Sequence, residues 1–369
     1  MNIFFCYHLN KFSGWGTLSL NYISAFKKNN VIVFCNKANS QLKFKQYEVL
    51  RDPLKYLKNP FLIFIDSFKL IKIIKEIKNN SKKKISAHIL VEPYVLFLII
   101  LNKFFKRKIF YCIGTYSNIL TSSLKFRVIF RIISSLLTHL IFLSSYSKKM
   151  IINKIHVRKS CRILVLNPII KLTTAITVKK KNKNKNFNIV SVGAIKERKG
   201  YHHLIEVMNI LINKYKLSII LNIIGEVNER LYFENLKNKI TNYKLEKNIF
   251  FTGKISDKRL DGFYKNCDVF ALLSNQTGHH FEAFGIVYLE ALAKGKQIII
   301  SKDSGGADIK KIDKRIFVEK PNSYMKISNF IKKIYNNKII ITPRENILIY
   351  KKSYENSVNI FNKFKNSFL

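Results

Sequence analysis

The sequence predicts an α/β protein that consists of two doubly wound parallel-sheet domains. Its 369 residues exceed the usual size of one hydrophobic core, and 47% of them are hydrophobic, which is enough to fill two cores. Three successive strand–helix units follow residue 188, which is typical of a parallel sheet with helices on both faces. Periodicity is lost over residues 171–187, where KLTTAITVKKKNKNKNF becomes a lysine–asparagine run. We therefore expect domains at residues 1–170 and 188–345, a linker between them, and a final helix over 346–369.

The first half begins with a predicted strand, NIFFCYHL, then a loop, NKFSGWGTLS, and then a helix. Gly14 and Gly16 in that loop allow a close approach of the backbone to a ligand, although a pair of glycines is weak evidence alone. ISAHILVEP and KIFYCIGTYSN indicate strands that run into loops. THLIFLSSYSKKM indicates a strand that leads into a helix, and ILVLNPI a last strand before the linker.

The second half begins with the predicted strand NIVSVG, a basic loop, and a helix that follows Gly200. LSIILNIIGE indicates a strand that ends at Gly225, NIFFTGKI a short strand with Gly253, and LDGFYKNCDVFALLSN a helix followed by a strand. A basic, glycine-containing loop between strand and helix is the arrangement that binds phosphate at the carboxyl edge of a parallel sheet. The alternative is that the loop is merely solvated and the glycines only form turns.

The most informative stretch is GHHFEAFGIVYLEALAKGKQIIISKDSGGADI, over residues 278–309. Glu282 lies in a predicted loop, and Glu290 lies eight positions later on a predicted helix. The first turn of that helix, from Gly285 to Val287, offers backbone N–H groups and a dipole that bind anions. Glu290 can accept hydrogen bonds from both hydroxyls of a ribose, as acidic residues do in dinucleotide sites. An ordinary strand–loop–helix unit with solvated glutamates is the alternative.

This stretch resembles the E-x7-E signature of the large retaining glycosyltransferase family with the GT-B fold, family 4, also called glycosyl transferases group 1. FEAFGIVYLEALAKG and the strand–SGG after it carry the resemblance. It implies two Rossmann-like domains that face each other across a cleft, with the acceptor on the N-terminal domain and the nucleotide sugar on the C-terminal domain. It also implies that the final helix crosses back onto the first domain. It also implies that Glu282 contacts the donor sugar, that Glu290 holds the ribose, and that the backbone of residues 284–287 meets sugar and phosphate.

The resemblance extends to a lysine, at Lys199, that neutralises the donor diphosphate. The family's arginine position after Gly193 holds Ala194, so Arg198 is the candidate substitute.

The family's histidine turn reads Ile113-Gly114-Thr115-Tyr116, with isoleucine in place of histidine. The remaining donor-side candidates are Gly14, Gly16, Gly193, Gly225, Lys254, Ile255, Phe284, Gly285, Ile286 and Val287. His88 and Tyr116 are candidates on the acceptor side, and His88 is a further catalytic candidate, although a lone strand histidine is more often structural.

The implied function is transfer of a sugar, with retention, from a nucleotide-diphosphate sugar to a glycan or lipid-linked acceptor. A hexosyltransferase of surface polysaccharide or lipopolysaccharide biosynthesis is the expectation. No metal or cofactor is expected, because the sequence has no Asp-x-Asp and no cluster with ligand spacing. The alternatives are a sugar-nucleotide epimerase, a glycan phosphorylase, for which we find no pyridoxal phosphate signal, and a non-catalytic binding protein on the same scaffold.

The formal net charge of +44 attracts phosphate-bearing partners, although lysine, asparagine and isoleucine are also the products of A+T-rich codons. No nucleic-acid-binding motif is present, so a specific nucleic-acid partner is not expected. KNPFLIFIDSFKLIKIIKEIK and LKFRVIFRIISSLL mix basic and apolar residues, which is typical of helices in a bilayer interface. Core helices with solvated lysines are the alternative.

The most apolar run, VLFLIIL from Val95, is shorter than the ~20 residues that a membrane span needs. NIFFCYHL lacks the features of a signal peptide. Five scattered cysteines indicate reduced thiols. These features predict a cytoplasmic protein, with peripheral contact at the inner face of the plasma membrane as an option.

Overall fold

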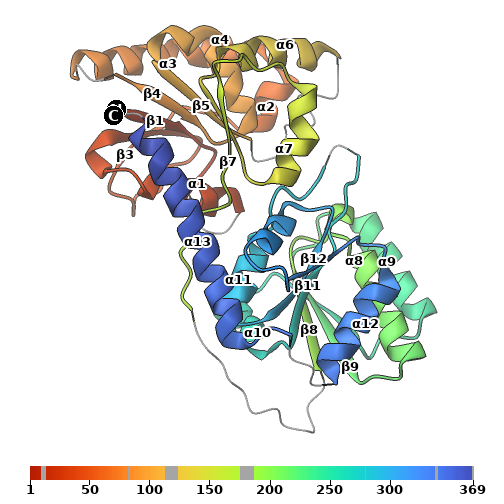
Figure 1. Ribbon diagram of the computed structural model, residues 1–369. Coiled ribbons are helices and arrows are strands. Elements are labelled where there is room, and N and C mark those ends of the chain that lie inside the picture. The colour runs from red at the N-terminus through yellow and green to blue at the C-terminus, as the bar shows by residue number, and fades with distance from the viewer. Residues whose placement is uncertain are drawn as a thin grey trace. The chain divides into compact units, whose positions relative to one another are not determined.

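A computed structural model describes residues 1–9, 14–81, 84–112, 124–174, 187–278, 280–336 and 340–367. The chain divides into an N-terminal unit, residues 1–170, and a C-terminal unit, residues 171–369. Each unit has its own parallel sheet (Figure 1). The two units are therefore described one at a time.

The N-terminal unit is built on seven parallel strands in the order β3-β2-β1-β4-β5-β6-β7. The strands are β1 (Asn2–Phe5), β2 (Val31–Cys35), β3 (Lys45–Glu48), β4 (Ser86–Ile89), β5 (Arg107–Cys112), β6 (His139–Phe142) and β7 (Arg162–Val165). The central strands are apolar and buried over nearly their whole length, because helices cover both faces of such a sheet.

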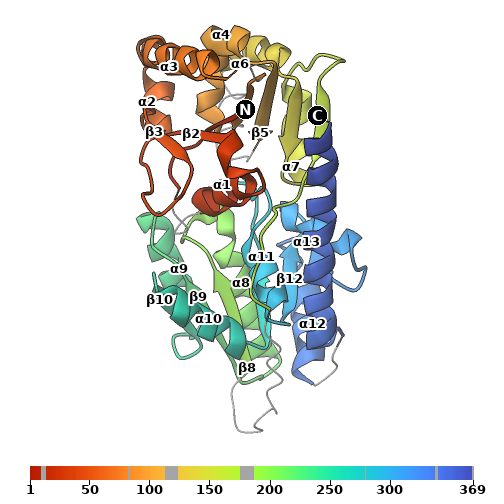
Figure 2. The same cartoon turned by 90° about the vertical axis from the view of Figure 1, so that its left-hand side faces the viewer.

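The helices of this unit are α1 (Gly14–Ser24), α2 (Pro53–Lys58), α3 (Phe61–Asn79), α4 (Leu98–Leu101), α6 (Leu124–Leu136) and α7 (Ser145–Ile151). Short 3₁₀ turns add Lys28–Asn30, Glu92–Phe97, Asn102–Phe104 and Ile152–Lys154. Helices α3, α4 and α6 lie at the same end of the unit in both views (Figures 1 and 2). Ser144 precedes α7 and forms a capping box, in which the Ser144 hydroxyl accepts from the N–H of Ser147 and the Ser147 hydroxyl accepts from the N–H of Ser144.

The C-terminal unit has six parallel strands in the order β10-β9-β8-β11-β12-β13. They are β8 (Phe187–Val192), β9 (Ile219–Ile224), β10 (Ile249–Gly253), β11 (Val269–Leu272), β12 (Gln297–Ser301) and β13 (Phe317–Glu319). The chain builds outward from β8 to β10 and then returns to the other side of β8 with β11. This reversal makes the β8–β11 junction the switch point where doubly wound sheets bind ligands.

Its helices are α8 (Tyr201–Asn209), α9 (Arg230–Asn242), α10 (Asp257–Asn266), α11 (Val287–Ala293), α12 (Tyr324–Tyr335) and α13 (Pro343–Asn366). A π-helical segment, Ile210–Lys214, extends α8, and 3₁₀ helices cover Glu197–Lys199 and Gly305–Lys311. Figure 1 shows α8, α9 and α12 on one face of the sheet and α10, α11 and α13 on the other.

The prediction of two doubly wound parallel-sheet domains is confirmed. The predicted domain limits, and a final helix that crosses back onto the first domain, stay predictions. All five cysteines are buried, and none forms a disulfide. Across the ranges that the structure describes, no helix combines the length and the apolar character needed to span a membrane.

Candidate functional site

Most of the predicted donor-side residues lie at the carboxyl edge of the C-terminal sheet, where the chain leaves β8, β9, β10, β11 and β12. The loop after β8 contains Arg198 and Lys199, and the loop after β11 contains Glu282. Because β8 and β11 are neighbours, these two loops meet at the switch point of the sheet.

Glu282 forms ion pairs with both basic residues of the β8 loop. Its Oε2 lies 2.8 Å from Arg198 Nη1 and 2.6 Å from Lys199 Nζ. The Glu282 and Lys199 side chains are only 13% and 11% exposed, so water screens this cluster weakly. Two cations share one carboxylate, so the cluster has a surplus positive charge that favours a further anion.

The electrostatics of this cluster are reflected in two pKa values. Burial alone raises the pKa of Glu282, but the charges of Lys199 and Arg198 outweigh it and hold that pKa at about 2. Burial lowers the pKa of Lys199; Glu282 counteracts this, and Arg198 adds to it. Glu282 is therefore ionised throughout the neutral range. Its single negative charge neutralises one of the two cations, so one positive charge remains.

The two loops are fixed to each other through their backbones. Gly200 adopts φ +69°, and a Cβ there would lie 1.8 Å from the carbonyl oxygen of Leu273, so only glycine fits. The N–H of Asn275 donates to the carbonyl of Arg198 at 3.0 Å. These contacts position the basic residues before any ligand binds.

The turn after Glu282 is packed around one aromatic ring. Gly285 has φ +85°, and a Cβ there would lie 2.7 Å from the ring of Tyr288. A Cβ on Gly306, in the turn after β12, would lie 2.5 Å from the same ring. The Tyr288 hydroxyl donates to the carbonyl of Leu272 at 2.7 Å. Tyr288 thus holds both glycine turns against the end of β11.

Helix α11 starts directly after this turn, with Ile286 in the N-cap position. The first hydrogen bonds of the helix are donated by the N–H groups of Tyr288, Leu289 and Glu290. The N–H groups of residues 285–287 precede them, as predicted, in the part of a helix where intrahelical partners are lacking.

Glu290 lies on α11 and accepts a hydrogen bond from Tyr264 on α10. The distance from the Tyr264 hydroxyl to Glu290 Oε2 is 2.6 Å. Burial raises the pKa of Glu290, while the Tyr264 hydrogen bond opposes part of that rise. One carboxylate oxygen is therefore held by Tyr264, and the orientation of the other is fixed with it.

Gly193 and Gly225 end β8 and β9, where the two backbones touch. A Cβ on Gly225 would lie 2.0 Å from the Gly193 carbonyl oxygen, which also accepts a 2.6 Å hydrogen bond from the Tyr201 hydroxyl. Gly225 is therefore required for packing, and a Cβ on Gly193 would lie 3.1 Å from Lys199 Cε. Lys254 is exposed and Ile255 half-buried in the loop after β10.

The candidates in the N-terminal unit are arranged differently. Helix α1 begins at Gly14 and includes Gly16, so these glycines lie on a helix and not in the predicted loop. Ile113 and Tyr116 lie outside the described residues.

His88 is wholly buried in β4, and its ring stacks on Phe4 with centroids 4.4 Å apart. Its nitrogens lie 3.1 Å from the Tyr111 hydroxyl and 3.1 Å from Asn2 Oδ1, and burial lowers its pKa to about 3. This geometry fits the structural alternative for His88 and argues against a catalytic role, because no substrate reaches the sheet core.

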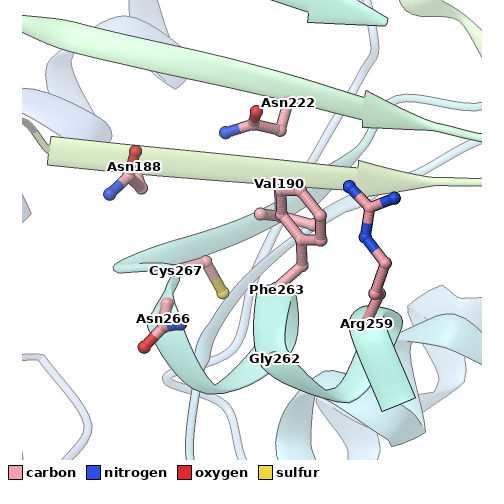
Figure 3. A pocket seen from close by; sticks show the side chains of 8 residues that line it. All are labelled: Asn188, Val190, Asn222, Arg259, Gly262, Phe263, Asn266 and Cys267. Carbon is pink, nitrogen blue, oxygen red and sulfur yellow. The ribbon is translucent and has the colours of Figure 1, made fainter. Parts of the chain in front are cut away.

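A separate cavity of about 290 Å³ lies between the sheet and α10 (Figure 3). Its lining comes from β8, β9 and α10 with the residue after it: Asn188, Val190, Asn222, Arg259, Gly262, Phe263, Asn266 and Cys267. None of the predicted site residues lines it. Within the ranges that the structure covers, no group of three His, Cys, Asp or Glu side chains is arranged to hold a metal ion.

Residues 173–353, which contain the whole cluster described above, match the family model for glycosyl transferases group 1. This part of the chain belongs to the glycosyl transferases group 1 family. The predicted group 1 glycosyltransferase family is thereby confirmed, while family 4 and the retaining mechanism stay predictions. Mannosylfructose-phosphate synthase of Agrobacterium fabrum is 26% identical over 121 residues, which is 32% of this chain and 26% of that protein. The match therefore spans about a quarter of that relative's length.

Outside the group 1 region, the likeness is one of fold. Anabaena HepE, solved in complex with UDP, superposes with a TM-score of 0.77 at 16% identity, over 100% of this chain and 99% of HepE. WaaG, a glycosyltransferase involved in lipopolysaccharide biosynthesis, superposes with a TM-score of 0.62 at 14% identity, over 97% of this chain and 95% of WaaG. The whole chain therefore has the GT-B fold.

Sequence reasoning missed two residues of the group 1 region that organise the site, Tyr264 and Tyr288. Tyr264 lies 26 residues before its partner Glu290, on a different helix, so no local spacing reveals the pair. Tyr288 lies within the motif, three residues after Gly285, and Gly285 was a usable signal because a residue without a Cβ leaves room for a large neighbouring ring.

Proposed function

We propose that the protein is a retaining hexosyltransferase that uses a nucleotide-diphosphate sugar as donor. The observation that carries the proposal is the surplus positive charge of Arg198 and Lys199 beside Glu282, at the switch point of a group 1 region. A diphosphate is the anion that such a pair of cations, together with a helix start, suits best. The UDP complex of HepE supports a nucleotide ligand.

In the proposed reaction the bond between the sugar's anomeric carbon and the diphosphate oxygen breaks, and a bond to an acceptor hydroxyl oxygen forms on the same face. The diphosphate leaves with the electron pair, and its charge grows in the transition state. Lys199, Arg198 and the first turn of α11 stabilise that charge, which is the electrostatic effect that dominates many enzymes. Glu282 orients the sugar and Glu290 the ribose. No metal ion is required for these roles.

The acceptor that we propose is a glycan or a lipid-linked saccharide in surface polysaccharide or lipopolysaccharide synthesis, at the cytoplasmic membrane face. The fold shared with WaaG supports this class without identifying the acceptor.

The decisive experiment is calorimetric titration of the full chain with UDP, GDP and ADP and with their glucose or mannose conjugates. Binding of one of these diphosphates is expected, weakened at least about tenfold by Lys199→Met, because a charge-assisted contact is lost. Lys247→Met is the matched control, because this exposed lysine precedes β10 and therefore lies at the opposite edge of the sheet from the cluster.

Turnover of the bound donor then separates the remaining outcomes. Transfer to an acceptor with unchanged anomeric configuration, unaffected by EDTA, supports the proposal. Conversion of the donor sugar without acceptor indicates an epimerase, and binding without any turnover indicates a binding protein. Failure of all diphosphates to bind contradicts the proposal.

A further inference from the structure

Helix α3 of the N-terminal unit exposes apolar side chains on the face that points away from its core. Its inner face buries Ile63, Asp66, Ser67, Leu70, Ile74 and Ile77. On the opposite face, Phe61, Phe64 and Phe68 are 66%, 53% and 74% exposed, and Ile65 between them is exposed as well. These positions are spaced i, i+3, i+4 and i+7, so they form one stripe over two turns.

This stripe has no role in folding that the structure shows. A surface helix in a globular protein normally presents charged residues opposite its core face. The rings of Phe61 and Phe64 lie 6.2 Å apart and pack on each other, so the side chains form one patch and are not scattered. A contiguous apolar patch of this kind marks an interaction site.

The remainder of the same helix face is basic. Lys69, Lys72, Lys75 and Lys78 are exposed along the last turns of α3, and Glu76 is the only exposed acidic residue on the helix. Asp66, its other acid, is buried and paired with Arg51 at 2.7 Å. The helix thus combines an apolar first half with a cationic second half.

Two neighbouring helices continue the pattern. Ile99 on α4 is exposed, and α6 exposes Val128 and Ile132 beside Arg127 and Arg131. Helix α4 contacts both α3 and α6, and the three lie at one end of the unit in both views (Figures 1 and 2). We call this end, formed by α3, α4 and α6, the apolar–basic face.

We propose that the apolar–basic face docks on a bilayer of anionic phospholipid, with Phe61, Phe64 and Phe68 inserted among the acyl chains and the lysines of α3 at the headgroups. Aromatic and aliphatic side chains that project beside lysines suit a lipid interface. A second copy of the chain suits it poorly, since both copies carry the same lysines and a net charge of +44. Membrane binding itself does not depend on the proposed function. Its consequence, access to a lipid-linked acceptor, rests on that function.

The test is co-sedimentation of the full chain with vesicles of phosphatidylglycerol and phosphatidylcholine, and with vesicles of phosphatidylcholine alone, without donor or acceptor. Binding to the anionic vesicles is expected. Phe61→Ser combined with Phe68→Ser should lower the partition coefficient at least about tenfold, because two rings no longer enter the acyl region. Leu231→Ser combined with Phe250→Ser, at exposed positions of the C-terminal unit, should leave it unchanged.

The charge contribution is tested with Lys72→Gln and Lys75→Gln, each expected to lower binding to anionic vesicles by about fivefold at low salt. Lys247→Gln and Lys258→Gln are the matched controls on the other unit. A Phe68→Trp variant should show fluorescence quenching by brominated lipids when vesicles are added.

Three outcomes overturn the proposal: equal vesicle binding by the phenylalanine variant and its control, self-association that depends on the phenylalanines, or binding of an oligonucleotide in place of vesicles. Circular dichroism will test whether each variant is folded, and nucleotide titration will test whether it retains its ligand site. Loss of vesicle binding with intact nucleotide binding therefore concerns the membrane face alone. Loss of nucleotide binding with intact vesicle binding concerns the transferase proposal alone.

Discussion

Glu290 is held in place by a tyrosine that belongs to another helix. The hydroxyl of Tyr264, a residue only 3% exposed, donates to Glu290 over 2.6 Å. If Glu290 holds the ribose of the donor, as proposed, a carboxylate fixed in this way loses little further freedom on binding. The hydrogen bond is therefore a means of positioning, and its removal should affect affinity for the donor more than the chemical step.

Replacing Glu290 by Ala should raise the donor KM by about tenfold or more, because hydrogen bonds to a charged group are lost. Glu290→Gln keeps an acceptor for Tyr264 and serves as the structural control, and Tyr264→Phe should raise KM by a smaller factor. Steady-state kinetics give KM and kcat separately, and thermal melting reports the fold. An unchanged donor affinity in Glu290→Ala would remove this residue from the ribose role.

Glu282 makes stability depend on pH in acid. Its folded pKa, about 2, lies below the ordinary value of 4.5, so its ionised form stabilises the folded state above about pH 4.5. That contribution, about 3 kcal/mol for this shift, declines as the pH falls from 4.5 toward 2. Urea unfolding between pH 6 and pH 3 should show a steeper loss in the wild type than in Glu282→Gln, in which this group no longer titrates. Parallel curves would show that the ion pairs contribute nothing to the unfolding free energy.

Most of the residues that meet at the candidate donor site could be found from the sequence, whereas the surroundings of His88 could not. Glu282, Glu290 and Lys199 could be predicted because the chemistry lies in short segments with fixed spacing. His88 could not be evaluated from its strand alone, since burial depends on the neighbouring strands and on Phe4. Tyr264 escaped because its contact depends on how α10 lies against α11, which no local pattern encodes.

At the scale of elements, the turn that leads into α11 depends on glycine for two reasons. Gly285 needs a left-handed φ of +85°, and its neighbour Tyr288 leaves no room for a Cβ. Gly253 also has a left-handed φ, +67°, but a Cβ there meets nothing within 4 Å. Substitution of Gly253 therefore tests backbone strain alone, whereas substitution of Gly285 tests backbone strain together with a steric clash.

Gly253→Ala should cost about 1 kcal/mol of unfolding free energy from strain alone, and Gly285→Ala about 2–4 kcal/mol because the Tyr288 ring must also move. Urea denaturation measures both. Gly262→Ala in the middle of α10, where a Cβ has open space, should be neutral or stabilising by up to about 1 kcal/mol. Equal losses for Gly285→Ala and Gly253→Ala would mean that the ring moves aside freely.

The periodicity of the sequence predicted which segments are strands and which are helices. It did not always predict which face of a helix is buried. In the last helix, Tyr350, Tyr354, Val358 and Phe361 recur at helical spacing, which predicts that they share one buried face. The structure buries Tyr350 and Phe361 but leaves Tyr354 and Val358 only half-buried, and it buries Ser353 and Ser357. Small serines on a helix permit close packing against a neighbour, which a hydrophobic pattern does not register.

At the scale of the whole molecule, the net charge of +44 is the dominant electrostatic fact. The described ion pairs use only some of the lysines, so like charges repel one another over the surface of each unit. Repulsion of this kind disfavours the compact state, because unfolding moves the charges apart. The same charges draw phosphate-bearing ligands and anionic surfaces toward the protein.

Salt should therefore stabilise this protein. Raising NaCl from about 10 mM to about 150 mM shortens the screening length from about 30 Å to about 8 Å, so the melting temperature at pH 7 should rise. Near pH 10, close to the sequence pI of about 10.0, lysines lose charge and the same salt step should have less effect. Differential scanning calorimetry at both pH values makes the comparison, with Lys199→Met included to separate anion binding at the cluster from general screening. A melting temperature that falls with salt at pH 7 would show that attractive ion pairs, and not repulsion between lysines, control the stability of the folded chain.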